Sequence, residues 1–167
     1  MSSESQIPSI YRLWHLYIEP AAACQGAVMA ARSPLLYLGV MSPAANRSHY
    51  HPELQVVFDQ LAATYFLFAF NQAVVLRVVG ANLAVWRTMI TGMLLCDVFH
   101  VAATVKALGW ERVLDPSVWR LFDWVNILML LASLAIRTAF LAGVGVCERF
   151  KRCKTALFMT FVFVYRI

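Results

Sequence analysis

The run WRTMITGMLLCDVFHVAATVKAL (Trp86–Leu108) decides the class of fold, because it is long and apolar enough to cross a bilayer. Arg87 and Lys106 flank it, and its one carboxylate, Asp97, lies close to its midpoint. A charge at that depth costs at least about 2.5–3.5 kcal/mol, so an acid there is a functional-site hypothesis by default. His100 follows one turn later on the same helical face. We therefore expect an acid and an imidazole to share one buried face.

The composition of the whole chain agrees with a membrane protein. Of 167 residues, 61% are hydrophobic and only 14% are charged, which is far more apolar than a soluble domain. The chain has room for four spans of roughly 20 residues each. We predict an all-α, polytopic transmembrane four-helix bundle over residues 1–145, followed by a basic juxtamembrane segment and a short apolar tail over residues 146–167. We expect it to lie in the endoplasmic reticulum or another endomembrane.

The net charge of +5 comes largely from the basic segment near the C-terminus, which favours lipid headgroups over nucleic acid as its partner. The polar segment at residues 1–7 lacks the basic region of a cleaved signal peptide. No CxxC pair is present, so the sequence indicates neither a zinc site nor a disulfide framework.

The first span is expected at Pro8–Ala31, and its polar residues point to a buried site. His15 and Glu19 lie one turn apart on one face, with Glu19 near the middle of the span. Pro20 follows directly and lacks a backbone N–H, so it frees the carbonyl of Leu16 from its usual bond. We expect a nearby side chain or a water to take that carbonyl as a partner.

The longest connection is Arg32–Pro52, and loops of this length are uncommon unless they serve a purpose. Two interpretations stay open: an interfacial linker, or a segment that covers a site. His49 and His51 lie in it, but two histidines without a third ligand nearby are a weak metal signal. We predict no metal.

The second span is expected at Leu54–Val79, with several amides and hydroxyls among aromatic residues. Such groups commonly join transmembrane helices, for about 0.6 kcal/mol each. This is the expected role of Thr64. Asn71 lies nearer the midplane, where it could bind an oxygen of the substrate.

The fourth span, Val118–Gly145, has the clearest polar stripe. Asp123, Asn126, Ser133 and Arg137 recur at helical spacing and therefore line one face. Fourteen residues of helix correspond to about 21 Å, so Asp123 and Arg137 cannot pair with each other. Each must find partners on other helices or in a wet cavity.

Successive spans cross the membrane in opposite directions, so the position of each polar group within its span predicts its depth in the membrane. Spans one and three run outward and spans two and four run back, so two carboxylates lie near the midplane and three further groups lie toward one outer surface. The groups expected to converge are Glu19, Asp97, His100, Asp123 and Asn126, while Arg137 belongs to the other half and approaches Glu19 or Asp97 from beneath.

Acids and bases with separated pKa values suit proton-shuttling reactions on a lipophilic substrate that enters from the bilayer. One such reaction opens an epoxide, and another moves a double bond. Neither needs a cofactor, and no nucleotide loop, nucleophile elbow or zincin motif is visible. The hypothesis assigns catalysis to Asp97, His100, Glu19 and Asp123, and substrate binding to Asn126, Asn71 and Arg137.

Two non-catalytic interpretations compete with catalysis. Any one of these polar residues, taken alone, could only fix helix register, and the protein could bind a lipid without transforming it. A transporter is disfavoured because four spans show no internal repeat or paired broken helices. Depth argues for function at Asp97, His100 and Glu19, since the cost of insertion rises toward the midplane.

The chain also resembles a known group of proteins over about residues 7–145. Small four-span fungal membrane proteins are similar at the segments Ile7–Arg12, Tyr17–Pro20 and Cys96–His100, and at Asp115-Pro116, Trp119, Asp123–Asn126 and Arg137. Some of these resemble membrane-bound epoxide hydrolases of fungal polyketide clusters, which open polyene epoxides on the way to pyrone mycotoxins of the citreoviridin and aurovertin type. The plan is also loosely similar to the sterol isomerase and sigma-2 receptor superfamily. The resemblance implies epoxide opening in secondary metabolism, with a sterol or terpenoid isomerase or cyclase as the alternative.

Overall fold

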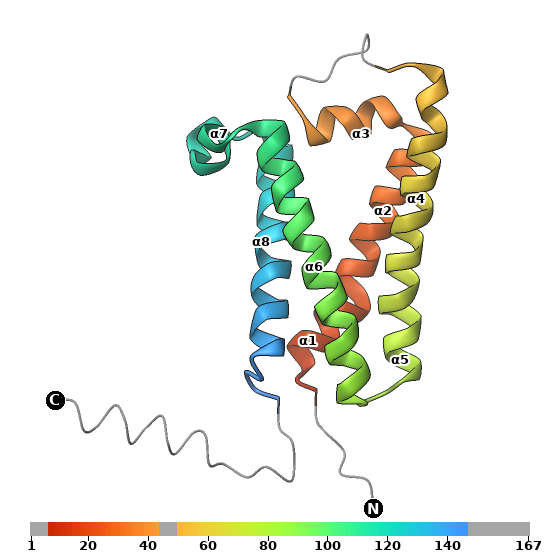
Figure 1. Ribbon diagram of the computed structural model, residues 1–167, viewed down its shortest axis with the longest axis vertical. Helices are drawn as coiled ribbons and strands as arrows, with labels where there is room; N and C mark the ends of the chain where they lie inside the picture. Colours follow the sequence, from red (N-terminus) through yellow and green to blue (C-terminus); the bar gives the residue numbers. More distant parts are fainter. Residues whose placement is uncertain (1–6, 44–49, 147–167) are drawn as a thin grey trace, which may run out of the picture.

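The computed structural model describes residues 7–43 and 50–146, and every regular element in them is helical (Figure 1). Four long helical segments run along the molecule, two of them interrupted by a π-helical turn. The first comprises α1 (Ser9–Leu13), the turn η1 (Trp14–Ile18) and α2 (Glu19–Arg32); the second α4 (Gln55–Phe70), the turn η4 (Asn71–Val75) and α5 (Leu76–Val78); the third α6 (Leu83–Leu108); the fourth α8 (Leu121–Leu141).

Four short helices complete the described part of the chain. They are α3 (Pro34–Met41), η3 (Pro52–Leu54), α7 (Trp110–Leu114) and η5 (Pro116–Val118). The predicted all-helical class is confirmed for these residues. The basic segment and tail at 146–167, apart from Val146, lie outside the described residues, as do positions 1–6 and the loop at 44–49 that contains His49.

Three helices of the described chain are long and apolar enough to cross a membrane. They are Pro52–Val78, Leu83–Leu108 and Leu121–Leu141. The exposed surface of these helices is rich in large apolar side chains, as expected of a surface that faces lipid. The chain therefore has the helices of a membrane protein. The first helix, Ser9–Arg32, is similar in length to the other three but is not among the three apolar ones.

The long helices pack in two pairs. α2 lies against α4, and α6 lies against α8 (Figure 1). The two π-helical turns η1 and η4 also pack on each other. The short helix α3 crosses one end of the molecule and contacts both α2 and α8. At the other end the Tyr11 hydroxyl donates to the carbonyl of Val144 at 2.9 Å, which brings the two ends of the described chain together.

The buried apolar residues form two clusters, one for each end of the molecule. The first gathers around Trp86, Ile90 and Phe140, which are at most 1% exposed. The second joins α2, α3 and α4 through small and aromatic residues. Its small members Ala27, Ala30 and Ala62 allow the close approach of helix backbones that is common in membrane proteins.

The expected consequence of Pro20 is confirmed. The carbonyl of Leu16, which has no N–H partner at position 20, accepts a hydrogen bond from Nη2 of Arg77 at 2.9 Å. Nη1 of Arg77 donates to the carbonyl of Ala73, and its guanidinium lies 4.6 Å from the ring centre of Tyr17. A proline in the first helix thus provides an anchor for the second.

The connection 32–52 contains a helix, α3, that covers one end of the bundle. Tyr37 of α3 is buried against Phe58, and its hydroxyl lies 2.9 Å from that of Tyr65. Burial is the main cause that raises the pKa of Tyr37, and the neighbouring Tyr65 adds to it. The aromatic contacts fix α3 to the α2 and α4 pair.

Candidate functional site

A cluster of charged side chains lies between three long helices, and we call it the central cluster. Arg137 of α8 pairs with Glu19 of the first helix and with Asp97 of α6. The side chain of Arg137 is 3% exposed, against 14% for Glu19 and 11% for Asp97. One buried guanidinium therefore holds two carboxylates that are 78 residues apart in the chain (97 − 19).

Two further side chains complete the central cluster around Glu19. Nδ1 of His15 lies 2.9 Å from Oε2 of Glu19, one turn earlier on the same helix. The Ser133 hydroxyl donates to Oε1 of Glu19 at 3.4 Å. Nη1 of Arg137 also donates to the carbonyl of Met93 at 3.4 Å. Glu19 is thus held from two helices, with its oxygens divided between His15 on one side and Arg137 with Ser133 on the other.

Asp97 stands at the border between the central cluster and the outer surface of α6. His100, one turn further on along α6, is exposed. Leu95, Val98 and Phe99 beside it are between 55% and 75% exposed. His100 and these apolar side chains therefore lie at the surface, whereas Asp97 is largely buried beside Arg137.

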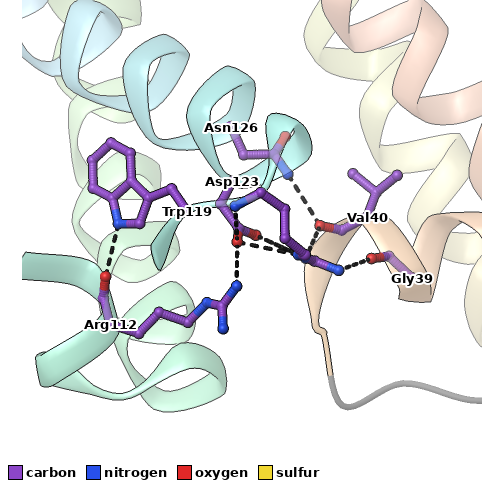
Figure 2. Close-up of polar contacts among 7 residues, drawn as sticks. Gly39, Val40, Arg112, Trp119, Asp123 and Asn126 are labelled. Atoms are coloured by element: carbon purple, nitrogen blue, oxygen red, sulfur yellow. Dashed lines mark hydrogen bonds and ion pairs between the residues drawn. The ribbon is translucent and has the colours of Figure 1, made fainter. Parts of the chain in front are cut away.

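A second polar cluster lies at the start of α8, and we call it the capping cluster (Figure 2). Both oxygens of Asp123 are used by arginines: Oδ2 accepts from Arg112 at 2.9 Å, and Oδ1 accepts from Arg120 at 2.7 Å. The backbone N–H of Arg120 also donates to Asp123, at 3.0 Å. An acid in the first turn of a helix is favoured by the helix dipole and by unpaired N–H groups there.

The capping cluster ties α3 to α8. The Arg120 guanidinium donates to the carbonyl of Gly39 at 2.9 Å and to that of Val40 at 3.4 Å, and the amide of Asn126 donates to the same Val40 carbonyl (Figure 2). These carbonyls belong to the last turn of α3, where backbone oxygens lack partners within the helix. The hydrogen bond with Asp123 raises the pKa of Arg120, so it is a permanent cation.

The predicted convergence of five polar groups is corrected by this arrangement. Glu19 and Asp97 meet, and Arg137 joins them as the sequence predicted. Asp123 and Asn126 are not with them. They lie 14 and 11 residues before Arg137 on α8 (137 − 123 and 137 − 126), or about 21 and 16 Å along the helix. Their partners are the connection before α8 and α3, which supply the two arginines and the free carbonyls.

The second helix also differs in detail from the prediction. The Thr64 hydroxyl donates to the carbonyl of Gln60 on its own helix and is exposed, so it is no link between helices. Asn71 is half-buried at the start of η4. Gln72, next to it, is the buried amide, at 1% exposure, and its Nε2 donates to Sδ of Met93 at 3.3 Å.

Several polar residues in or outside the two clusters were not assigned a role from the sequence. His15 was detectable, because its spacing from Glu19 places both on one helical face. Arg112 and Arg120 were not, since charges at the end of a span commonly extend into the interface. Gln72 gave no signal in sequence that distinguishes it from Asn71. The missed residues are His15, Gln72, Arg112 and Arg120.

Comparison with known proteins gives a family but no activity. No curated protein and no solved structure matches the chain. A family model described as "Domain of unknown function (DUF7704)" matches residues 4–146, which include both polar clusters and all the described helices. Since this match covers most of the 167 residues, the chain belongs to the DUF7704 family.

Proposed function

We propose that this protein is an intramembrane acid–base enzyme that opens an epoxide on a lipophilic polyketide-like substrate. The observation that carries the proposal is the pairing of one buried arginine, Arg137, with two carboxylates, Glu19 and Asp97. The resemblance to membrane-bound epoxide hydrolases of fungal polyketide clusters supplies the reaction.

The charges of the central cluster imply a proton that can be exchanged. Arg137 carries one positive charge, whereas Glu19 and Asp97 together carry two negative charges when both are ionised. An unbalanced charge in a membrane interior is costly, so the cluster favours one further proton, shared among Glu19, Asp97 and His15. Such a proton is what a general acid needs.

The exposed side of the cluster defines how the reaction would proceed. Asp97 donates its proton to the epoxide oxygen while a carbon–oxygen bond of the ring breaks. A water attacks that carbon, and its proton passes to His100, from which it returns to Asp97. The net reaction adds one water to the epoxide. A hydroxyl of the substrate can replace the water, and the product is then a cyclic ether.

Glu19 acts in this reaction as a positioning residue. His15 and Ser133 hold the Glu19 carboxylate, Glu19 holds Arg137 in place, and Arg137 in turn orients Asp97. Asp123 and Asn126 bind α8 and α3 to each other and take no part in the proton transfers proposed here.

The proposal includes four membrane crossings in an endomembrane. The first helix is the fourth crossing, beside the three apolar helices. It has 24 residues from Ser9 to Arg32 (32 − 9 + 1), which span about 36 Å. Its polar residues His15 and Glu19 lie toward the other helices, so their cost in the membrane is offset by partners.

The test is deletion of the gene in its source organism. The strains are grown in ¹⁸O-labelled water, and their lipophilic metabolites are analysed. The deletion strain should accumulate an epoxide, and the wild-type gene should restore a diol that carries one labelled oxygen or an isomeric cyclic ether. Asp97→Asn should reduce the product by about 10²–10⁴-fold, the usual contribution of general acid–base catalysis. Asp59→Asn, an exposed carboxylate of α4, is the matched control and should restore the product.

Two results would contradict the proposal. Asp97→Asn could restore the product at normal protein level, which would remove Asp97 from the mechanism. Alternatively, the deletion strain could accumulate an olefin whose double bond is moved by the wild-type protein without opening of any epoxide, which would replace the hydrolase by an isomerase.

A further inference from the structure

Two buried side chains that take no part in the proposed ring opening each have a polar atom without a hydrogen-bond partner among the described residues. Nε2 of His15 and Oε1 of Gln72 have no hydrogen bond within residues 7–43 and 50–146, although the two residues are only 0% and 1% exposed. Buried polar atoms are nearly always paired, because an unpaired one has lost its water without a replacement. Two such buried atoms indicate a polar ligand between helices.

The two side chains belong to segments that pack together. His15 lies in the π-helical turn η1 and Gln72 lies in η4, and these turns contact each other. Both side chains also face α6. The His15 ring lies 6.4 Å from that of Trp86, and the Gln72 amide nitrogen donates to Met93. A π-helical turn is rare and is frequently found at functional sites, so two in contact reinforce the indication.

The hydrogen-bonding capacity of the two atoms identifies the ligand. Nδ1 of His15 lies against the Glu19 carboxylate, so in the neutral ring Nδ1 carries the hydrogen and Nε2 is an acceptor. The Gln72 amide nitrogen is engaged by Met93, which leaves Oε1 as an acceptor too. One water has two hydrogens and can donate one to each acceptor.

We infer that a water binds between Nε2 of His15 and Oε1 of Gln72, and that His15 passes a proton between this water and Glu19. A proton that arrives on the water moves to Nε2, while the Nδ1 proton moves to the Glu19 carboxylate. The reverse sequence returns it. Only N–H and O–H bonds form and break, so no other reactant is required. Binding of the water is independent of the reaction catalysed; its use in turnover, as a second path for protons to and from the central cluster, rests on the proposed function.

The experiment uses the full chain in lipid bilayers without substrate, with ¹⁵N- and ¹³C-labelled histidine. Solid-state NMR detects transfer of magnetisation from water to each histidine ring, and His15→Gln identifies the His15 signals. Transfer to the buried His15 ring is expected, as it is for the exposed His51, which is the internal standard. Gln72→Met should abolish transfer to His15. Gln60→Met, at an exposed position of α4, should preserve it.

The inference is overturned if wild-type His15 receives no magnetisation from water while His51 does, or if Gln72→Met leaves the transfer unchanged. The wild-type measurement decides the matter even if Gln72→Met does not fold. Because no substrate is present, failure of the epoxide proposal would not alter these spectra, and the two proposals can fail separately.

Discussion

The Arg137 guanidinium joins the first, third and fourth long helices through ion pairs. It reaches Glu19 and Asp97 from a position that is 3% exposed, and neither carboxylate has another arginine or lysine as a partner among the described residues. Removal of one partner of a buried ion pair destabilises a protein far more than replacement of all its charged members by neutral residues. The reason is that the remaining charge is left without compensation.

Arg137→Met is therefore expected to destabilise the protein by about 3–5 kcal/mol. Thermal unfolding in detergent, followed by tryptophan fluorescence, measures the loss. The triple variant that adds Glu19→Gln and Asp97→Asn should regain most of the stability, because no charge is then left unpaired. Arg12→Met is the control at an exposed position. A triple variant no more stable than Arg137→Met would show that packing, and not charge balance, explains the effect.

At this scale the sequence predicted contacts within a helix better than contacts between elements. The proximity of His15 and Glu19 followed from helical spacing, and the approach of Arg137 to Glu19 or Asp97 followed from depth. The partners of Asp123 could not be found in the same way. They depend on the path of the connections before α8, which no periodicity describes.

The helix α3 is held at its two ends by different kinds of interaction. Its first half packs through Tyr37 on aromatic residues of α4, whereas its last turn is bound through the carbonyls of Gly39 and Val40 to Arg120 and Asn126. A cation at a helix C-terminus is stabilising because it neutralises the partial negative charge there. The Arg120 contacts thus control how firmly α3 closes this end.

Arg120→Ala should release the last turn of α3, while Arg112→Ala should not. Both substitutions remove an arginine from Asp123, but only Arg120 also reaches α3. Hydrogen–deuterium exchange of the amides at residues 37–42, measured by mass spectrometry, should be faster in Arg120→Ala and unchanged in Arg112→Ala. Equal exchange in the two variants would assign the effect to Asp123 and the start of α8.

The existence of α3 was beyond the reach of sequence reasoning. Its eight residues, PLLYLGVM, are apolar all round, so they show no helical periodicity, and Pro34 at its start together with Pro43 just after its end favours a loop. The long helices were predicted well, because about 20 apolar residues leave no alternative in a bilayer. The π-helical turns were not predicted, since an inserted residue leaves no signature in composition.

For the whole molecule, the position of the chain ends tests the number of crossings. Gly145 lies against Pro8, with a Cβ built on Gly145 3.5 Å from Cγ of Pro8, so both ends of the described chain lie at one end of the bundle. Four crossings place them on the same side of the membrane. Three crossings, without the first helix, would place them on opposite sides.

Epitopes inserted before Ile7 and after Val146 should therefore be digested together when protease is added to sealed vesicles. An epitope at Ser117, in the exposed connection between α6 and α8, should be digested only from the opposite side. Digestion of the Ile7 epitope together with that at Ser117 would mean that the first helix does not cross.

The ion pair between Glu19 and Arg137 has a consequence for biosynthesis, because its partners are 118 residues apart in the chain. The ribosome completes the first helix long before it makes α8. In the four-crossing topology proposed above, Glu19 enters the membrane before its cation has been made, at a cost of about 2.5–3.5 kcal/mol if it is ionised at the bilayer centre. A nascent chain that ends before Arg137 should then have a first helix that the lipid retains poorly.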